Sequence, residues 1–139
     1  MKILRTPDEC FDNLKDYPFE PNYIDIEHND QTLRMHFLDE NSESEEIVLL
    51  MHGEPTWSYL YRKIIPILVS NGKRVIAPDL IGFGKSDKPS SREDYSYANH
   101  IMWVETLIKK LDLKNIIFFA QDWGGLIGLR LLAKYPDLY

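Results

Sequence analysis

The chain has 139 residues, of which 44% are hydrophobic and 12% are aromatic. This composition is enough to fill a sizeable core, which excludes a disordered or fibrous protein. The formal net charge of −6 provides no attraction to phosphates, so we expect no nucleic-acid partner. Cys10 is the only cysteine, which excludes an intrachain disulfide and fits a reducing compartment, so we expect a cytoplasmic protein.

The chain shows no targeting or membrane signal. Its first ten residues carry Lys2 and Arg5 but no apolar stretch long enough for a signal peptide. The longest apolar runs, Ile47–Met51 and Ile116–Ala120, are far shorter than the ~20 residues that a membrane-spanning helix needs. We therefore expect no membrane partner.

The first predicted elements form a β-hairpin. Residues 23–28 and 33–38 alternate partly between apolar and polar side chains, and Asn29 and Asp30 between them are typical turn residues. Residues 39–46 are acidic and rich in serine, without an apolar side chain, and this pattern indicates a solvated loop.

From residue 47 onward, continuous apolar runs alternate with segments of helical spacing. The predicted strands are Ile47–Met51, residues 74–77 and Ile116–Ala120, and the predicted helices are residues 59–70, 97–111 and 124–134. Asn71 and Gly72 suit a left-handed helix end, and Ser96 suits a helix start. Apolar strands separated by helices indicate the α/β class, with a parallel sheet covered on both faces, in one domain or part of one.

The segment Ala120-Gln-Asp-Trp-Gly-Gly125 joins the last predicted strand to the last predicted helix. Small residues stand two before Asp122 and two and three after it. A nucleophile elbow needs this spacing, because it forces its central residue into a strained backbone conformation where larger neighbours would clash. The alternative is that Asp122 only caps the following helix, a position that aspartate favours.

A second segment favours the catalytic interpretation of Asp122. The first predicted parallel strand ends in Leu50-Met-His-Gly-Glu-Pro-Thr-Trp57. Gly53, just past the strand end, allows a close approach of backbone to a ligand, and the loop offers the N–H groups that an oxyanion hole requires. We expect this loop to lie beside Asp122.

The chain resembles the haloalkane dehalogenases of the α/β-hydrolase fold. The resemblance is carried by residues 52–62, 75–89 and 121–125, and it extends to residues 5–7 and 17–23, so it covers essentially the whole chain. The His-Gly-x-Pro and Asp-Trp-Gly-Gly motifs also occur in epoxide hydrolases of this fold. Glu54, where another dehalogenase branch has asparagine, points to the subfamily in which two tryptophans bind the halide.

The resemblance implies an α/β-hydrolase fold with a mostly parallel sheet, helices on both faces and an N-terminal antiparallel hairpin. Residues 1–139 would be the N-terminal part of the core domain, with the cap and the C-terminal part of the core absent. The fold in this chain is therefore expected to be incomplete. The break also leaves the apolar strand Ile116–Ala120 unpaired on one side, from which we expect poor solubility.

The resemblance also implies a reaction. Asp122 matches the aspartate that attacks the halogen-bearing carbon to form an alkyl ester, which a histidine-activated water hydrolyses to a primary alcohol. Trp123 would donate its indole N–H to the halide, and the backbone N–H groups of Glu54 and Trp123 would form the oxyanion hole. The implied partners are a small halogenated alkane, water and the halide product, while the oligomeric state is left open.

Other interpretations apply to several of these residues. Outside an elbow, Trp123 would be a core aromatic, and the Glu54 side chain reads as a solvated loop acid. Trp57 and Phe83 fit either packing or a pocket wall. Among the histidines, His52 resembles a fold-supporting residue of the oxyanion loop, while the others, His28, His36 and His100, are expected to be structural or solvated.

Two nucleotide-binding motifs are excluded. Gly82-Phe-Gly84 begins like a dinucleotide fingerprint, but Asp87 replaces its third glycine. Gly84-Lys-Ser86 ends like a phosphate-binding loop, but Asp79 replaces its first glycine. No cysteine or histidine cluster has zinc spacing, so we expect no metal and no cofactor.

We expect the 139 residues alone to show no turnover, because none of them matches the histidine that would hydrolyse the ester. Two alternative functions remain open. One is an epoxide hydrolase, which shares the aspartate elbow. The other is a non-catalytic truncated remnant.

Overall fold

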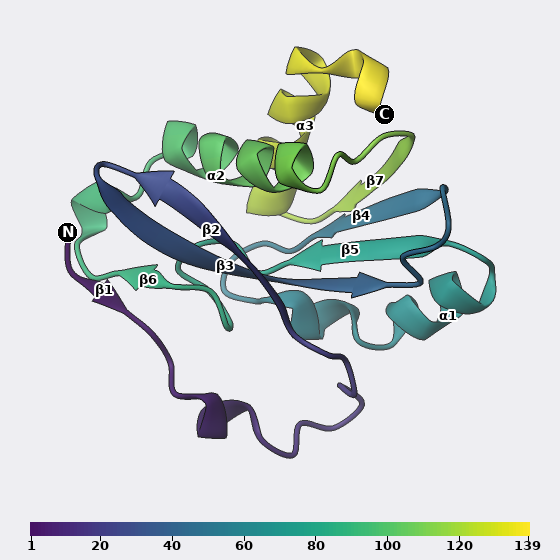
Figure 1. Ribbon diagram of the computed structural model, residues 1–139, viewed down its shortest axis with the longest axis horizontal. Coiled ribbons are helices and arrows are strands. Elements are labelled where there is room, and N and C mark those ends of the chain that lie inside the picture. Colours follow the sequence, from purple (N-terminus) through teal and green to yellow (C-terminus); the bar gives the residue numbers. More distant parts are fainter.

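The computed structural model describes residues 1–139 and contains a five-stranded mixed sheet (Figure 1). Its strand order is β2-β3-β5-β4-β7. The strands are β2 (Asn22–His28), β3 (Gln31–Glu40), β4 (Ile47–Met51), β5 (Arg74–Pro78) and β7 (Ile116–Ala120). β4 runs parallel to β5 and β7, whereas β2 and β3 form an antiparallel hairpin that pairs with β5.

Helices cover both faces of this sheet, as expected for the α/β class. α1 (Ile64–Ser70) lies on one face, and α2 (Tyr97–Lys110) and α3 (Trp123–Lys134) lie on the other (Figure 1). Four short 3₁₀ helices complete the helical content, namely η1 (Asp8–Phe11), η2 (Ser58–Tyr61), η3 (Arg92–Asp94) and η4 (Pro136–Leu138). No helix is both long enough and apolar enough to span a membrane.

The two faces of the sheet bury separate hydrophobic clusters. β4 is buried along its whole length, and its alternate side chains enter different clusters, because successive residues of a strand point to opposite faces. Leu49 joins the larger cluster with Trp103 of α2 and Ile127 of α3. Leu50 joins the smaller one with Ile65 of α1. Such burial on both faces explains the continuous apolar run of β4.

Most predicted elements are confirmed, with differences at their ends. The helix predicted to begin at residue 59 begins at Ile64 instead, after the separate turn η2. Pro66 explains the late start, because it has no N–H to bond to the carbonyl of Arg62 and is tolerated only in the first turn of a helix. The loop predicted from residue 39 is wrong at its start, since Asp39 and Glu40 belong to β3 and pair with β5.

The helix boundaries predicted from capping residues agree well with the structure. Ser96 caps α2, accepting a hydrogen bond from the N–H of Asn99 at 3.0 Å. Gly72, after α1, adopts a φ of +80°, the left-handed conformation expected there.

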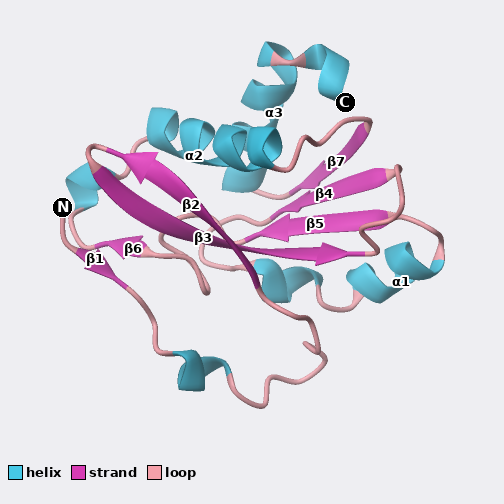
Figure 2. Ribbon diagram, in the orientation of Figure 1, coloured by secondary structure: helices cyan, strands magenta, loops and turns pink.

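A small second sheet was not predicted. β1 (Ile3–Leu4) pairs antiparallel with β6 (Lys88–Pro89). Two residues are too few to show a periodicity, so the pairing left no signal in the sequence. The guanidinium of Arg5 donates hydrogen bonds of 2.6 and 2.9 Å to Asp87 beside it. Most of the chain between β1 and β2 is loop (Figure 2).

Candidate active site

Asp122 stands between β7 and α3 in a strained conformation. Its φ is 56° and its ψ is −126°, values that a non-glycine residue rarely adopts. The strained elbow predicted from the spacing of small residues is therefore confirmed. Asp122 occupies the N-cap position of α3, but its side chain makes no capping hydrogen bond. This geometry disfavours the alternative in which Asp122 serves only as a helix cap.

Two glycines allow the loops to meet at Asp122. A β-carbon on Gly124 would lie 2.4 Å from the carbonyl oxygen of His52, and one on Gly53 would lie 2.4 Å from Cβ of Asp122. Both distances are far below contact distance, so only glycine fits. A β-carbon on Gly125 would meet nothing within 4 Å, so the elbow does not require a small residue there.

The loop after β4 contacts the carboxylate of Asp122, as predicted. The backbone N–H of Glu54 donates a hydrogen bond to Oδ2 of Asp122 at 3.0 Å. Hydrogen bonds from the backbone N–H groups of Trp123 and Glu54 lower the pKa of Asp122 below its ordinary value. The carboxylate is therefore ionised at neutral pH, exposed to solvent and oriented by backbone.

The buried side chain of His52 stabilises this loop through hydrogen bonds. Its Nε2 accepts a hydrogen bond from the N–H of Leu80 at 2.9 Å, and its Nδ1 lies 2.9 Å from the carbonyl oxygen of Gly53. Burial lowers the pKa of His52, which favours the neutral ring that this pair of contacts requires. Both ring nitrogens are occupied, so His52 supports the fold, as its resemblance suggested.

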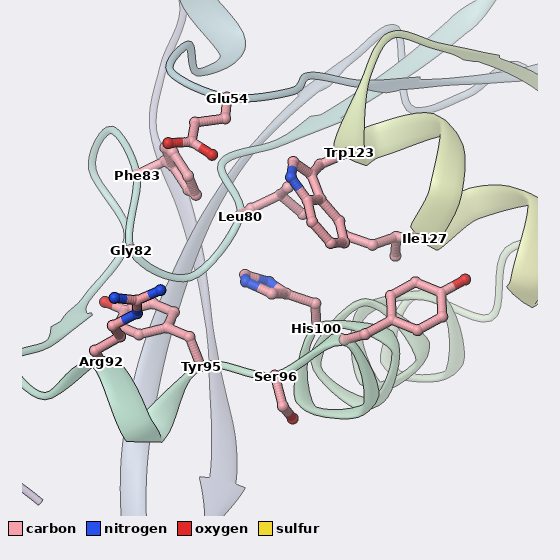
Figure 3. Close-up of a pocket in the computed structure, with 11 residues that line it drawn as sticks. Glu54, Leu80, Gly82, Phe83, Arg92, Tyr95, Ser96, His100, Trp123 and Ile127 are labelled. Atoms are coloured by element: carbon pink, nitrogen blue, oxygen red, sulfur yellow. The ribbon is translucent and has the colours of Figure 1, made fainter.

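A cavity of about 550 Å³ lies beside the elbow. Its lining residues are Glu54, Leu80, Gly82, Phe83, Arg92, Tyr95, Ser96, Tyr97, His100, Trp123 and Ile127. The side chains of Trp123 and His100 point into the same space (Figure 3). Trp123 is 41% exposed, which argues against its alternative role as a core aromatic. The cavity is large enough for a small organic molecule.

The two aromatic residues left undecided by the sequence have different environments. Phe83 lines the cavity. Trp57 instead packs in an aromatic cluster, where it stacks on Tyr59 with ring centroids 5.6 Å apart and lies 5.2 Å from the ring of Tyr17.

His100 is a cavity residue that the sequence did not reveal. Its ring packs edge to face against Trp103 at 5.0 Å. Burial, together with the nearby His52, lowers the pKa of His100 to about 4, so the ring is neutral at ordinary pH. His28 and His36 are both buried and therefore structural rather than solvated. No group of three or more potential ligand side chains is placed to hold a metal ion.

A comparison with known protein families found a family model that matches most of the chain. The family model described as alpha/beta hydrolase fold matches residues 46–138. Among curated proteins, the chain is similar to a haloalkane dehalogenase of Psychrobacter cryohalolentis, with 59% identity over 140 residues, and to one of Mycolicibacterium paratuberculosis, with 55% identity over 138 residues. The matches cover 100% and 99% of this chain but 46% of each relative. The chain thus spans about half the length of these relatives.

Solved structures give the same picture. The haloalkane dehalogenase DpaA from Paraglaciecola agarilytica, described as tetrameric, matches with a TM-score of 0.94 and 48% identity over 99% of this chain and 46% of its own. A mutant epoxide hydrolase from Vigna radiata matches with a TM-score of 0.72 and 32% identity over 86% of this chain and 36% of its own. The likeness to DpaA is the stronger of the two by both measures.

Proposed function

The chain belongs to the alpha/beta hydrolase fold family, and we propose that it carries the nucleophile portion of a haloalkane dehalogenase. Residues 1–139 would form the N-terminal part of the core domain. The observation that supports this most directly is the ionised carboxylate of Asp122, which is exposed at a strained elbow and bonded through one oxygen to the N–H of Glu54.

In the proposed first step, Oδ1 of Asp122 attacks the carbon that bears the halogen. A carbon–oxygen bond forms as the carbon–halogen bond breaks, and the halide leaves with the bonding electrons. Oδ2 meanwhile keeps its hydrogen bond to Glu54, which fixes the direction of attack. Aspartate suits this step because its alkyl ester can be hydrolysed, whereas an alkylated serine would be an inert ether.

Trp123 is the proposed halide-binding residue in this chain. Its indole ring enters the cavity next to the elbow (Figure 3), and the indole N–H is a donor without acceptor capacity. The N-terminus of α3, which begins at Trp123, adds the positive end of a helix dipole. Both features stabilise a halide as it acquires charge.

The backbone N–H groups of Glu54 and Trp123 are the proposed oxyanion hole. When water attacks the ester, negative charge develops on the carbonyl oxygen derived from the carboxylate. The N–H of Glu54 already donates a hydrogen bond to Oδ2 of Asp122. Both N–H groups lower the pKa of Asp122, so both favour negative charge at this position.

Hydrolysis of the ester requires a general base, and none of the four histidines hydrogen-bonds Asp122. His100 lines the cavity, but its lowered pKa of about 4 makes it a weak base at neutral pH. We therefore propose that the 139-residue chain is alkylated once and then retains the ester. A halogenated alkane would be its substrate, without a cofactor, and the cytoplasm remains its expected location.

Intact-mass measurement after incubation with 1,2-dibromoethane tests this proposal. Exposed Cys10 is replaced by serine in every variant, because 1,2-dibromoethane would alkylate its thiol. In this background we expect one persistent bromoethyl adduct on the chain with Asp122 and none on Asp122→Asn, whose amide is a far weaker nucleophile. Absence of an adduct from the folded chain with Asp122 would refute the assignment. Release of many equivalents of bromide would instead contradict the expected lack of turnover, and a His100→Gln variant would then show whether His100 acts as the base.

An epoxide hydrolase is the second candidate, because the epoxide hydrolase of Vigna radiata shares the fold at 32% identity. Parallel incubation with styrene oxide separates the two. An adduct at Asp122 with the epoxide but not with the bromoalkane would favour the epoxide hydrolase. Labelling by neither reagent would favour the non-catalytic remnant.

A further inference from the structure

We propose that Asp79 is a positioning residue, which holds the Glu54 amide against the carboxylate of Asp122. This role deepens the proposed function and rests on it for the reaction, whereas the contact between Glu54 and Asp122 can be measured without catalysis. Asp79 touches neither Asp122 nor the cavity, so it would act only through the backbone of the loop after β4.

Asp79 follows the end of β5 and is completely buried. Its Oδ1 accepts a hydrogen bond from the N–H of Ser58 at 2.7 Å. Its Oδ2 accepts one from the N–H of Lys85 at 2.9 Å and lies 2.8 Å from Nδ1 of His36. A single carboxylate therefore joins the loop after β4, the loop after β5 and the hairpin strand β3.

The hydrogen bond to Ser58 is one of two hydrogen bonds, or ties, that connect the loop after β4 with the loop after β5. Asp79, from the loop after β5, bonds the N–H of Ser58 in the loop after β4. His52, from the loop after β4, accepts a hydrogen bond from the N–H of Leu80 in the loop after β5. Because His52 and Ser58 stand on either side of Glu54 in the sequence, the two ties fix both ends of the short segment that presents the Glu54 amide.

The site is built for a charged group. Burial works to raise the pKa of Asp79, but hydrogen bonds from His36, Lys85 and Ser58 outweigh it and keep the pKa below its ordinary value. A β-carbon on Gly84 would lie 2.4 Å from Oδ2 of Asp79, so the loop after β5 closes directly over the carboxylate. Asparagine has a single acceptor oxygen. It therefore cannot accept hydrogen bonds from all three donors, as the two carboxylate oxygens of Asp79 do.

The experiment follows the backbone amide of Glu54 by NMR while the pH is varied. All variants carry Glu54→Gln, which keeps this backbone amide and removes the residue's own carboxyl group from the titration. In the otherwise wild-type chain, the Glu54 amide shift should report the titration of Asp122, with a midpoint below the ordinary aspartate value of 3.8. In Asp79→Asn, we expect the Glu54 amide to lose this titration and the Asp122 midpoint to rise towards 3.8. The rate of Asp122 alkylation should fall by about 10²-fold, the scale of a misplacement of roughly 1 Å.

Asp87→Asn is the matched control. Asp87 is also a buried aspartate in the chain after β5, and it accepts a hydrogen bond from the N–H of Arg34 at 2.9 Å, but it makes no bond to the loop after β4. Asp87→Asn should lower stability while leaving the Glu54 titration and the alkylation rate unchanged. A folded Asp79→Asn variant with wild-type titration and alkylation would overturn the proposed role.

A second pair of variants covers the case in which Asp79→Asn does not fold. His36→Asn retains a donor near the position of Nδ1, whereas His36→Leu removes it. We expect His36→Asn to preserve the Glu54 titration and His36→Leu to weaken it, and equal titration in both would contradict the role. If the wild-type chain is not alkylated but the titration still depends on Asp79, the proposed function fails and the positioning role stands.

Discussion

At the scale of single residues, Gly124 and Gly125 provide a direct test of the elbow geometry. A β-carbon on Gly124 would lie 2.4 Å from the His52 carbonyl oxygen, while one on Gly125 would meet nothing within 4 Å. We expect Gly124→Ala to destabilise the chain by roughly 1–3 kcal/mol through overpacking against backbone. Gly125→Ala should be neutral or stabilise it by up to about 1 kcal/mol, because alanine favours a helix.

Urea unfolding of both variants distinguishes these outcomes, with the midpoint as the measured quantity. Equal midpoints for the two variants would show that the loops can move apart at little cost. The close approach of the loop after β4 to the elbow would then not constrain Asp122.

Sequence reasoning at this scale was most successful where the signal was local. The elbow, the loop of Glu54 and the position of Trp123 follow from short runs of residues with a defined geometry. His100 and Asp79 left no such signal. His100 sits on a helix of ordinary apolar pattern, and Asp79 lies in a segment, residues 75–89, that carries the family resemblance without indicating a role for this residue. Their significance depends on which loops the fold brings together.

At the scale of elements, Glu105 links two helices. It lies on α2, forms an ion pair with Lys109 one turn further along, and accepts hydrogen bonds from Tyr135 and, at 2.8 Å, from Lys134 at the end of α3. Burial works to raise the pKa of Glu105, but these partners outweigh it and lower the pKa to about 2. The Glu105 carboxylate therefore forms a pH-dependent contact between α2 and α3.

Replacement of Glu105 by glutamine should remove about 1 kcal/mol of stability at pH 7, as for a favourable surface network. A carboxylate with a depressed pKa stabilises the fold above its unfolded value of 4.5 and loses that contribution as the pH falls towards about 2. The stability difference between wild type and Glu105→Gln should therefore shrink over this window. Urea unfolding at several pH values measures it.

Glu43→Gln is the control for this comparison, because Glu43 is exposed and forms no ion pair. Its stability difference from wild type should stay near zero at every pH. A Glu105→Gln difference that persists unchanged at pH 2 would show that packing, not charge, gives Glu105 its effect.

The predictability of an element depended on its length and burial. The parallel strands and α2 were predicted closely because these strands are apolar runs and α2 has both a periodic pattern and a capping serine. The pair β1 and β6 and the four 3₁₀ turns were missed, since each has at most four residues, too few to show a periodicity. The pair β1 and β6 also depends on contacts distant in the sequence.

At the scale of the whole molecule, β7 is an edge strand with an exposed apolar surface. It pairs with β4 on one side only, and Ile117 and Phe119 are 52% and 51% exposed. Edge strands with apolar side chains associate unless a charge or a covering element prevents it. Poor solubility of the chain, which we expect from the sequence, would have this edge as its physical cause.

We predict concentration-dependent self-association of the chain, which Ile117→Lys should reduce. Ile67→Lys is the control, because Ile67 is similarly exposed, at 60%, but lies on α1 rather than at the sheet edge. Sedimentation velocity over a range of concentrations measures the effect. An equal reduction by both variants would show that general charge, rather than the β7 edge, governs association.

The pairing of β1 with β6 also bears on the order in which the chain folds. Ile3 pairs with Pro89, and Arg5 bonds Asp87 across 82 residues of sequence. During synthesis β1 cannot pair until β6 has been made. At the usual rates of translation, the synthesis of the intervening residues takes on the order of ten seconds. Throughout that interval Ile3 and Arg5 lack the partners that hold them in the folded chain, so a chaperone or a protease can reach this segment.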